Sequence, residues 1–194
     1  MKVTVLGAGG GEVTGSAYLL QTKTAKVLVD FGMYQGGSKT ENYNRLPRNE
    51  HIRDLSCVVL THAHLDHTGR LPLLTRVGYR RPIYATPATI DIATIILKDA
   101  VRLQKMEVER TNRKRKRRGE SQIEPLYNEE DVLALKPLMQ TMQYDKPTEI
   151  APGVVVRAVE AGHMLGSASL EFTVEEGGNK KVIKIGRASC RERV

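Results

Sequence analysis

The chain is poor in cysteine and in aromatic residues, and it has no long hydrophobic run. Two cysteines in 194 residues, Cys57 and Cys190, exclude a disulfide-stapled scaffold. No window approaches the roughly 20 apolar residues of a membrane span, and the start of the chain lacks the basic flank and apolar stretch of a signal peptide. With 40% apolar and 27% charged residues, the composition is that of a globular domain, which we expect in the cytoplasm with no membrane partner.

Short strand-like runs alternate with helical patterns, which predicts an α/β fold. Leu55–Leu60 is a short apolar run, typical of a strand buried on both faces, and Cys57 within it is expected in the core. A long helical pattern begins with Thr86 as N-cap and Pro87 at the first helical position, and it reaches about Arg113. Other strands are expected at residues 3–6, 17–22, 26–30, 82–85, 154–159 and 168–174, and other helices at 69–77 and from Asn128.

A cluster of metal-binding residue types follows the buried run. Three histidines, His62, His64 and His67, and one carboxylate, Asp66, fall within six positions, and a fourth histidine, His163, lies in a later glycine-containing loop. Neutral imidazole suits zinc, and a carboxylate can bind or bridge a second metal. A lone histidine would more often be a surface residue or a helix cap, but this clustering favours a metal centre.

The pattern H-x-H-x-D-H resembles the signature of the metallo-β-lactamase superfamily. The resemblance implies a four-layer αββα sandwich with a two-metal hydrolase site at one edge, between the two sheets. It also implies that His62, His64 and His163 bind the first metal, that Asp66 and His67 bind the second and act in catalysis, and that the intact enzyme holds two zinc ions. A two-metal site suits phosphodiester hydrolysis because it generates the nucleophile and neutralises charge on the scissile phosphate.

Four further segments are similar to the β-CASP nuclease branch of that superfamily: residues 7–16, 28–36, 125–132 and 161–168. The resemblance implies metal-dependent hydrolysis of RNA, as an exo- or endonuclease. Two alternatives stay open, namely another hydrolase of the superfamily, of thioesterase or lactonase type, and a non-catalytic RNA-binding relative. Residues 125–132 and the basic run described below favour the nuclease over small-molecule hydrolases, and the retained metal ligands favour an enzyme.

The resemblance ends near Ile183. In the family, the strand that begins here leads into a Ser-Gly-Asp segment whose aspartate bridges both metals, whereas residues 184–187 read Lys-Ile-Gly-Arg. Residues 185–194 back-translate, in one frame, onto a common sequencing adapter. We therefore expect residues 1–183 to be the N-terminal portion of a metallo-β-lactamase domain, without the β-CASP cap domain or the last metal histidine, and residues 184–194 to be a non-native tail. Such a chain is expected to bind one metal weakly and to turn over substrate poorly.

A dense run of positive charge, Arg110–Arg118, follows the long helical pattern, with seven basic residues in nine positions. Charge of this density needs a polyanion or solvent around it. Phosphate contacts from such a run would contribute affinity for RNA without sequence information. A solvated loop is the alternative. The candidate RNA contacts are Arg113, Lys114, Arg115, Lys116, Arg117 and Arg118.

Smaller expectations concern four other residues. Asp30 ends a strand, and the resemblance implies that it supports the metal ligands instead of binding a metal. Gly162 and Gly166 flank His163, and we expect them to let the loop turn sharply enough to deliver its imidazole. His51 has no metal-ligand neighbours in sequence and is expected at the surface.

Overall fold

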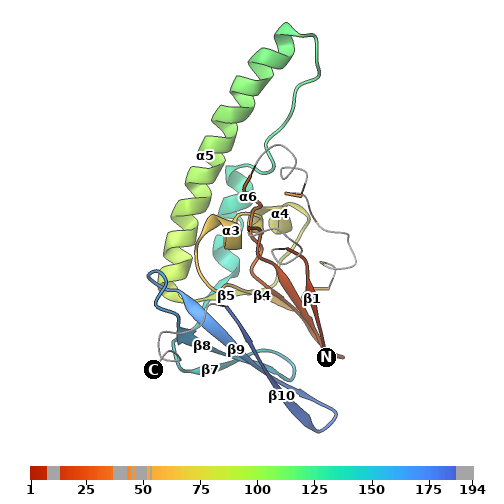
Figure 1. Cartoon of the computed structure of the whole chain (residues 1–194), viewed down its shortest axis with the longest axis vertical. Helices are drawn as coiled ribbons and strands as arrows, with labels where there is room; N and C mark the ends of the chain where they lie inside the picture. Colours follow the sequence, from red (N-terminus) through yellow and green to blue (C-terminus); the bar gives the residue numbers. More distant parts are fainter. Residues whose placement is uncertain (8–13, 37–42, 45, 47–51, 53, 187–194) are drawn as a thin grey trace.

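The computed structural model describes residues 1–7, 14–36, 43–44, 46, 52 and 54–186, which form two β-sheets and a set of helices (Figure 1). In the larger, six-stranded sheet β1 to β3 are antiparallel and β3 to β6 run parallel, so the parallel strands all end at the same edge. Its strands, in spatial order, are β1 (Lys2–Val5), β2 (Tyr18–Gln21), β3 (Lys26–Val29), β4 (Cys57–Val59), β5 (Ile83–Ala85) and β6 (Met139–Thr141).

The smaller sheet is antiparallel throughout, in the order β10-β9-β8-β7. Its strands are β7 (Pro147–Ala151), β8 (Val154–Glu160), β9 (Ala168–Glu176) and β10 (Asn179–Ile185). Strand β10 begins at Asn179, a few residues earlier than the start near Ile183 that the sequence predicted. The reason is the two-residue turn at Gly177 and Gly178, whose φ angles of 59° and 77° suit a hairpin turn that glycine permits and that keeps Asn179 paired with Glu176.

The helices cover one face of the six-stranded sheet (Figure 1). They are α3 (Leu65–Thr68), α4 (Leu71–Arg76), α5 (Pro87–Arg117), α6 (Glu129–Leu133) and a short 3₁₀ turn, η1 (Lys136–Leu138). Alternation along β3 divides the core: Leu28 packs with the helices, whereas Val27 and Val29 pack against Val156 and Phe172 of the smaller sheet. Burial of both faces explains the continuous apolar runs in the parallel strands.

The described residues therefore form three layers of an αββα sandwich, namely helices, six-stranded sheet and four-stranded sheet. Within the described ranges, no helix covers the outer face of the smaller sheet, as expected for an incomplete sandwich. Nor does any helix in this part of the chain have the length and apolarity needed to cross a membrane.

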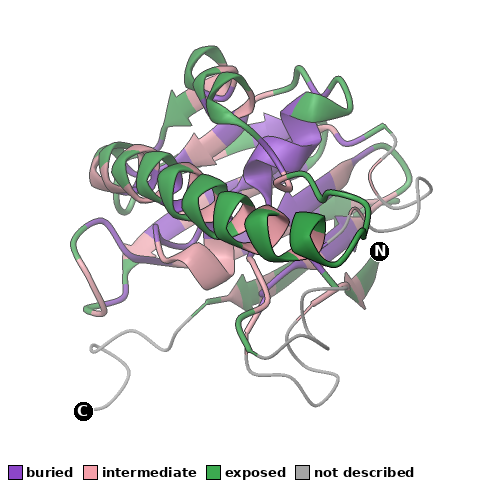
Figure 2. Cartoon of the chain, turned by 90° about the horizontal axis from the view of Figure 1, so that it is seen from above, coloured by how far each residue is buried: buried purple, intermediate pink, exposed green. Residues whose placement is uncertain are grey.

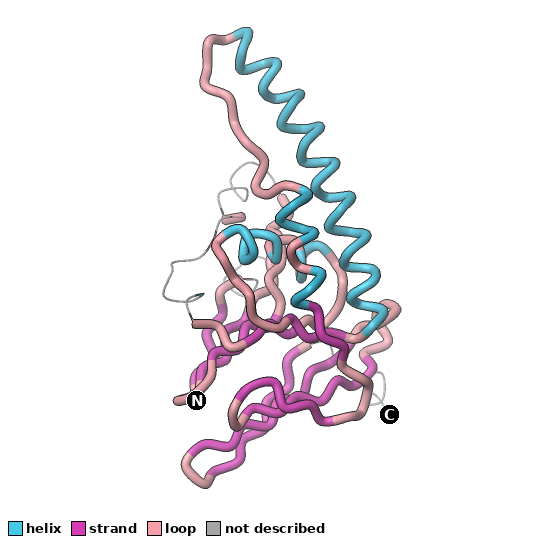
Figure 3. Tube along the Cα trace, turned by 180° about the vertical axis from the view of Figure 1, so that it is seen from behind, coloured by secondary structure: helices cyan, strands magenta, loops and turns pink. Residues whose placement is uncertain are grey.

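Helix α5 is the longest element, and its distal half extends away from the two sheets (Figures 1 and 3). It begins as predicted, with the Thr86 side chain capping the backbone N–H of Thr89 and Pro87 in the first turn. It continues past Arg113, where the helical pattern was expected to end, because a returning segment packs along its last turns through Asn112. Figure 2 shows the outward side of this helix exposed along its length.

Cys57 lies in the core, as predicted, and burial raises the pKa of its thiol to about 12. Because only the thiolate reacts readily with disulfide reagents, Cys57 is expected to stay unmodified by Ellman's reagent at pH 8 while the chain is folded. It should react fully once the chain is unfolded in guanidinium. A Cys190→Ser variant isolates the signal of Cys57, and rapid labelling of that variant under native conditions would contradict its burial.

Candidate metal centre

The histidine motif lies at the edge where the parallel strands end. His62 and His64 occupy the turn that follows β4, while Asp66 and His67 lie on the short helix α3. His62 is buried and the other three side chains are partly exposed, so the cluster opens to solvent on one side. The hydroxyl of Thr61 lies 2.9 Å from Nδ1 of His62, which leaves Nε2 as the nitrogen that can face a metal.

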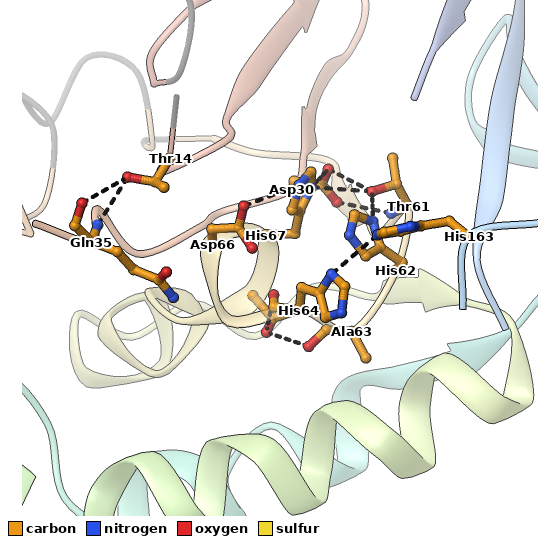
Figure 4. A network of polar contacts seen from close by, with 11 residues as sticks. Thr14, Asp30, Gln35, Thr61, His62, Ala63, His64, Asp66, His67 and His163 are labelled. Atoms are coloured by element: carbon orange, nitrogen blue, oxygen red, sulfur yellow. Dashed lines mark hydrogen bonds and ion pairs between the residues drawn. The ribbon is translucent and has the colours of Figure 1, made fainter. Parts of the chain in front are cut away.

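His62, His64 and His163 form a three-histidine group whose ligand nitrogens all lie within 4.8 Å of one another (Figure 4). Nε2 of His163 is 3.2 Å from Nδ1 of His64, although the two residues are 99 positions apart in the chain. Two nitrogens that bind one tetrahedral zinc ion, each about 2.0–2.1 Å from it, lie about 3.4 Å apart. The spacing and the neutral imidazole donors therefore fit a zinc ion.

His163 is delivered by a tight loop between β8 and β9. Gly162 and Gly166 have φ angles of 64° and 84°, so both adopt the left-handed conformation that glycine accepts without cost, as predicted. Oγ of Ser167, directly after Gly166, accepts hydrogen bonds from the backbone N–H groups of His163 and Met164, each at 3.1 Å. The loop is thus closed by its own side chain.

The start of helix α5 holds the same loop in place. The carbonyl oxygen of Gly166 accepts hydrogen bonds from the hydroxyls of Thr86, at 2.6 Å, and Thr89, at 2.8 Å. A Cβ atom at Gly166 would lie 2.6 Å from the backbone nitrogen of Thr89, so no larger residue fits there. The position of His163 therefore depends on the first turn of α5.

Asp30 organises the second part of the site. Its carboxylate accepts hydrogen bonds from the backbone N–H of Thr61, at 2.8 Å, and from the Thr61 hydroxyl, at 2.7 Å, and it lies 2.7 Å from Nδ1 of His67 (Figure 4). With Nδ1 held, Nε2 of His67 is directed to the side of Asp66, whose carboxylate is 3.7 Å away. Asp66 and His67 thus form a pair of possible ligands beside the three histidines, and Asp30 contacts a ligand as expected.

Gly32 is a site residue whose role the sequence did not reveal. A Cβ atom at this position would lie 1.5 Å from the carbonyl oxygen of Asp66. The same carbonyl accepts a hydrogen bond from the backbone N–H of Ser16, and Phe31 N–H donates to the carbonyl of His67. The loop after β3 is therefore threaded directly against the backbone that carries Asp66 and His67, and only glycine permits that approach.

Arg70 secures this loop from the other side. Its guanidinium lies over the rings of Phe31, at 4.4 Å, and Tyr34, at 4.9 Å, and it donates hydrogen bonds to the carbonyls of Gly32 and Tyr43. Burial lowers the pKa of Arg70 to about 10, which still keeps it charged at neutral pH. A buried arginine stacked on two rings is a structural anchor for the loop that supports Asp66.

The basic residues proposed as RNA contacts, Arg113 to Arg118, are not at the metal centre. They lie in the last turn and C-cap of α5, at the end opposite to the one that contacts the His163 loop. At 1.5 Å per residue, they lie about 40 Å along the helix axis from the first turn of α5, which contacts the His163 loop. Of the predicted site residues, the structure thus brings five together and keeps the basic group apart.

A family model described as "Metallo-beta-lactamase superfamily domain" matches residues 19–184, which include every ligand of this site. The chain belongs to the metallo-β-lactamase superfamily. That confirms the family predicted from the histidine motif, and the curated relatives are of the β-CASP type that the other segments indicated. The α/β fold and incomplete sandwich agree with this family as well.

Curated relatives of this metallo-β-lactamase domain are longer proteins. The chain is 36% identical to transcription termination factor FttA of Cenarchaeum symbiosum over 97% of its own length and 28% of that protein. It is 35% identical to a ribonuclease of Thermus thermophilus over 100% of its length and 39% of that protein. FttA of Thermococcus kodakarensis is 34% identical, with 91% of this chain and 26% of that protein covered. The chain thus spans well under half of these relatives.

Solved metallo-β-lactamases share the fold at low identity. SMB-1, bound to 2-mercaptoethanesulfonate, matches 94% of this chain and 60% of its own chain with a TM-score of 0.52 and 16% identity. Rm3 matches 88% of this chain and 55% of its own with a TM-score of 0.50 and 17% identity. These likenesses establish the arrangement of the sheets and helices.

Proposed function

We propose that this chain is the metal-binding part of a ribonuclease that hydrolyses RNA phosphodiester bonds with zinc ions, either within an RNA or from one end. The three-histidine group is the observation that carries the proposal, because its geometry fits a zinc ion and its neighbours Asp66 and His67 can hold another. The relatives named as a ribonuclease and as transcription termination factors support RNA as the substrate.

Each ligand has a distinct role in this proposal. His62, His64 and His163 would hold the first ion, and Asp66 and His67 the second. Bound zinc supplies a nucleophile from water at neutral pH and neutralises charge on the phosphate. The carboxylate of Asp66, partly exposed and 3.7 Å from Nε2 of His67, would orient the attacking water where the cluster meets solvent.

Hydrolysis by the zinc-loaded chain tests the proposal against its two rivals. Cleavage of an end-labelled RNA that disappears in a His62→Ala variant would support a ribonuclease. Turnover of a thioester or a lactone without RNA cleavage would support another hydrolase of the superfamily. Zinc-independent binding of RNA with no hydrolysis of any substrate would support a non-catalytic relative.

Zinc affinity is expected to depend strongly on His163. The three-histidine group is the only cluster of at least three close ligands among the residues that the structure describes, so the first ion should bind more tightly than the second. His163→Ala is expected to lower the affinity for the first zinc ion by at least about a hundredfold. Even the loss of a residue that only supports a ligand lowers metal affinity about 10- to 100-fold. Competition with a chromophoric chelator measures this.

His51→Ala is the matched control, because it removes the one histidine outside the motif and the His163 loop. It should leave zinc affinity unchanged. Equal affinity in the two variants, or two ions bound equally tightly by the unaltered chain, would contradict the assignment.

A further inference from the structure

Four cations at the end of α5 are exposed. They are Arg113, Lys114, Lys116 and Arg117, and we call them the basic tip. None of the four forms an ion pair with another described residue. The other three charges of the run have acidic neighbours: Arg110 lies 3.8 Å from Glu107, and Arg115 and Arg118 lie 3.2 and 4.0 Å from Glu120.

The inner side of the same helix end is braced. Asn112 both donates to the carbonyl of Ile123 and accepts from its N–H, each at 2.9 Å. Arg115 donates to the carbonyl of Ser121, so this predicted RNA contact is engaged in holding the return segment. The inner face of this helix end is held by these contacts. The four residues of the basic tip are spread over about half of the helix circumference.

The basic tip and the metal centre lie at opposite ends of one rigid helix. Gly166, in the loop of His163, contacts the first turn at Thr89, and the tip begins in the last turns at Arg113. The rise of an α-helix makes the distance between Thr89 and the basic tip about 40 Å along the helix axis. A nucleotide at the metal ligands is therefore too far away to contact the tip, and only a long or structured RNA can reach both.

The residue types of helix α5 favour binding of double-helical RNA over single-stranded RNA. No aromatic residue occurs between Tyr84 and Tyr127, so helix α5 has no ring on which a base can stack. Sites for single strands usually combine a basic groove with aromatic stacking, whereas duplex RNA is bound largely through phosphates and 2′-hydroxyls. Four unpaired cations on a protruding helix match the phosphates of a duplex.

We propose that the basic tip anchors the double-helical stem of a structured RNA while another part of the same RNA reaches the metal centre. A stem of about 16 base pairs, the length of A-form RNA that double-stranded-RNA-binding domains span, is long enough to cover this distance. The link to cleavage rests on the proposed ribonuclease function. Duplex binding at the tip does not, because it needs no metal.

Fluorescence anisotropy with two probes tests the anchor: a blunt RNA duplex of about 16 base pairs and an unstructured single strand of the same length. The tip variant carries Arg113→Gln, Lys114→Gln, Lys116→Gln and Arg117→Gln, and glutamine keeps good helix propensity. We expect at least about tenfold weaker duplex binding. The slope of log K against log salt concentration should become less steep by up to about 3.6, since each of the four lost phosphate contacts removes about 0.9. Binding of the single strand should change far less.

The matched control removes four exposed lysines elsewhere, with the changes Lys136→Gln, Lys146→Gln, Lys180→Gln and Lys181→Gln. It has the same net charge as the tip variant and should bind the duplex like the unaltered chain. Equal losses in the two variants would reduce the effect to net charge and overturn the proposal. If the tip variant lost more affinity for the single strand than for the duplex, the proposal that the tip binds a double-helical stem would be overturned.

Two further measurements separate this proposal from the proposed function. His62→Ala should bind the duplex normally, and the tip variant should bind zinc as tightly as the unaltered chain. Tip-dependent duplex binding together with turnover of a thioester or a lactone, and no RNA hydrolysis, would refute the ribonuclease and support the anchor. Hydrolysis with no effect of the tip on duplex binding would refute the anchor alone.

Discussion

Replacing Gly32 by alanine is expected to lower the free energy of unfolding by at least about 3 kcal/mol, at the upper end of what overpacking costs. The new Cβ would lie 1.5 Å from the carbonyl oxygen and 2.1 Å from the carbonyl carbon of Asp66. Both are backbone atoms of the metal motif, so no flexible side chain can move aside. The loop or helix α3 must shift instead, and zinc binding at the proposed Asp66–His67 site should be lost first.

Gly78→Ala is the control for this prediction. A Cβ there meets no atom within 4 Å, and its cost comes from the positive φ of 89°, about 1 to 2 kcal/mol. Urea denaturation measures both variants, and zinc titration shows whether the site is affected. A smaller loss of stability in Gly32→Ala than in Gly78→Ala would mean that the close approach of the two backbones is not present in solution.

The second large effect is expected from Asp30→Asn. Asp30 is 1% exposed and its φ of 56° is one that asparagine also tolerates, so the change acts on the carboxylate alone. An amide cannot accept from both groups of Thr61 while also pairing with His67, and a buried donor without an acceptor costs about 1 to 3 kcal/mol. We expect a loss of about 2 to 4 kcal/mol in stability and zinc binding by His67 weakened about 10- to 100-fold.

Asp145→Asn provides the comparison, because Asp145 has the same left-handed backbone, with φ of 60°, but an exposed carboxylate 3.9 Å from Arg157. Its stability should change by no more than about 0.5 kcal/mol. Thermal unfolding with and without zinc measures both variants. If Asp30→Asn and Asp145→Asn had the same unfolding temperature, the Asp30 carboxylate would not be holding the end of β4 and the metal motif together.

Both substitutions test the same structural idea, that the ligands are held by a frame of backbone and buried charge. Gly32 lets the loop after β3 lie against Asp66, and Arg70 holds that loop between two aromatic rings. Asp30 joins the end of β4 to His67. A frame of this kind orients ligands before any metal binds, which lowers the cost of binding.

Much of the site could be predicted from short stretches of sequence. His62, His64, Asp66 and His67 follow a buried strand within a few positions, so their proximity needs no knowledge of the rest of the fold. Gly162 and Gly166 likewise predicted the tight loop around His163, because glycine readily adopts left-handed backbone angles whatever its neighbours. The helix boundaries at Thr86 and Asn128 were readable from their capping side chains.

Other features depended on contacts between distant residues and were not visible in the sequence. The helical pattern predicted an end near Arg113, but the return segment bound at Asn112 stabilises α5 to Arg117. Arg115 was grouped with its neighbours as an RNA contact, which stays a prediction, and the structure adds that its guanidinium donates to the carbonyl of Ser121. A run of like charges does not indicate which members the fold turns inward.

The sequence by itself determined the ligand types, the family and the alternation of strands and helices, because these follow from residue chemistry and from patterns a few positions long. Only the tertiary structure decided that His163 meets His64 across 99 positions, that Gly32 lies against Asp66, and that the basic tip stands far from the metal centre. Such distances are set by strand order and by the packing of whole elements. No local pattern encodes them, since each depends on where the chain returns after a long excursion.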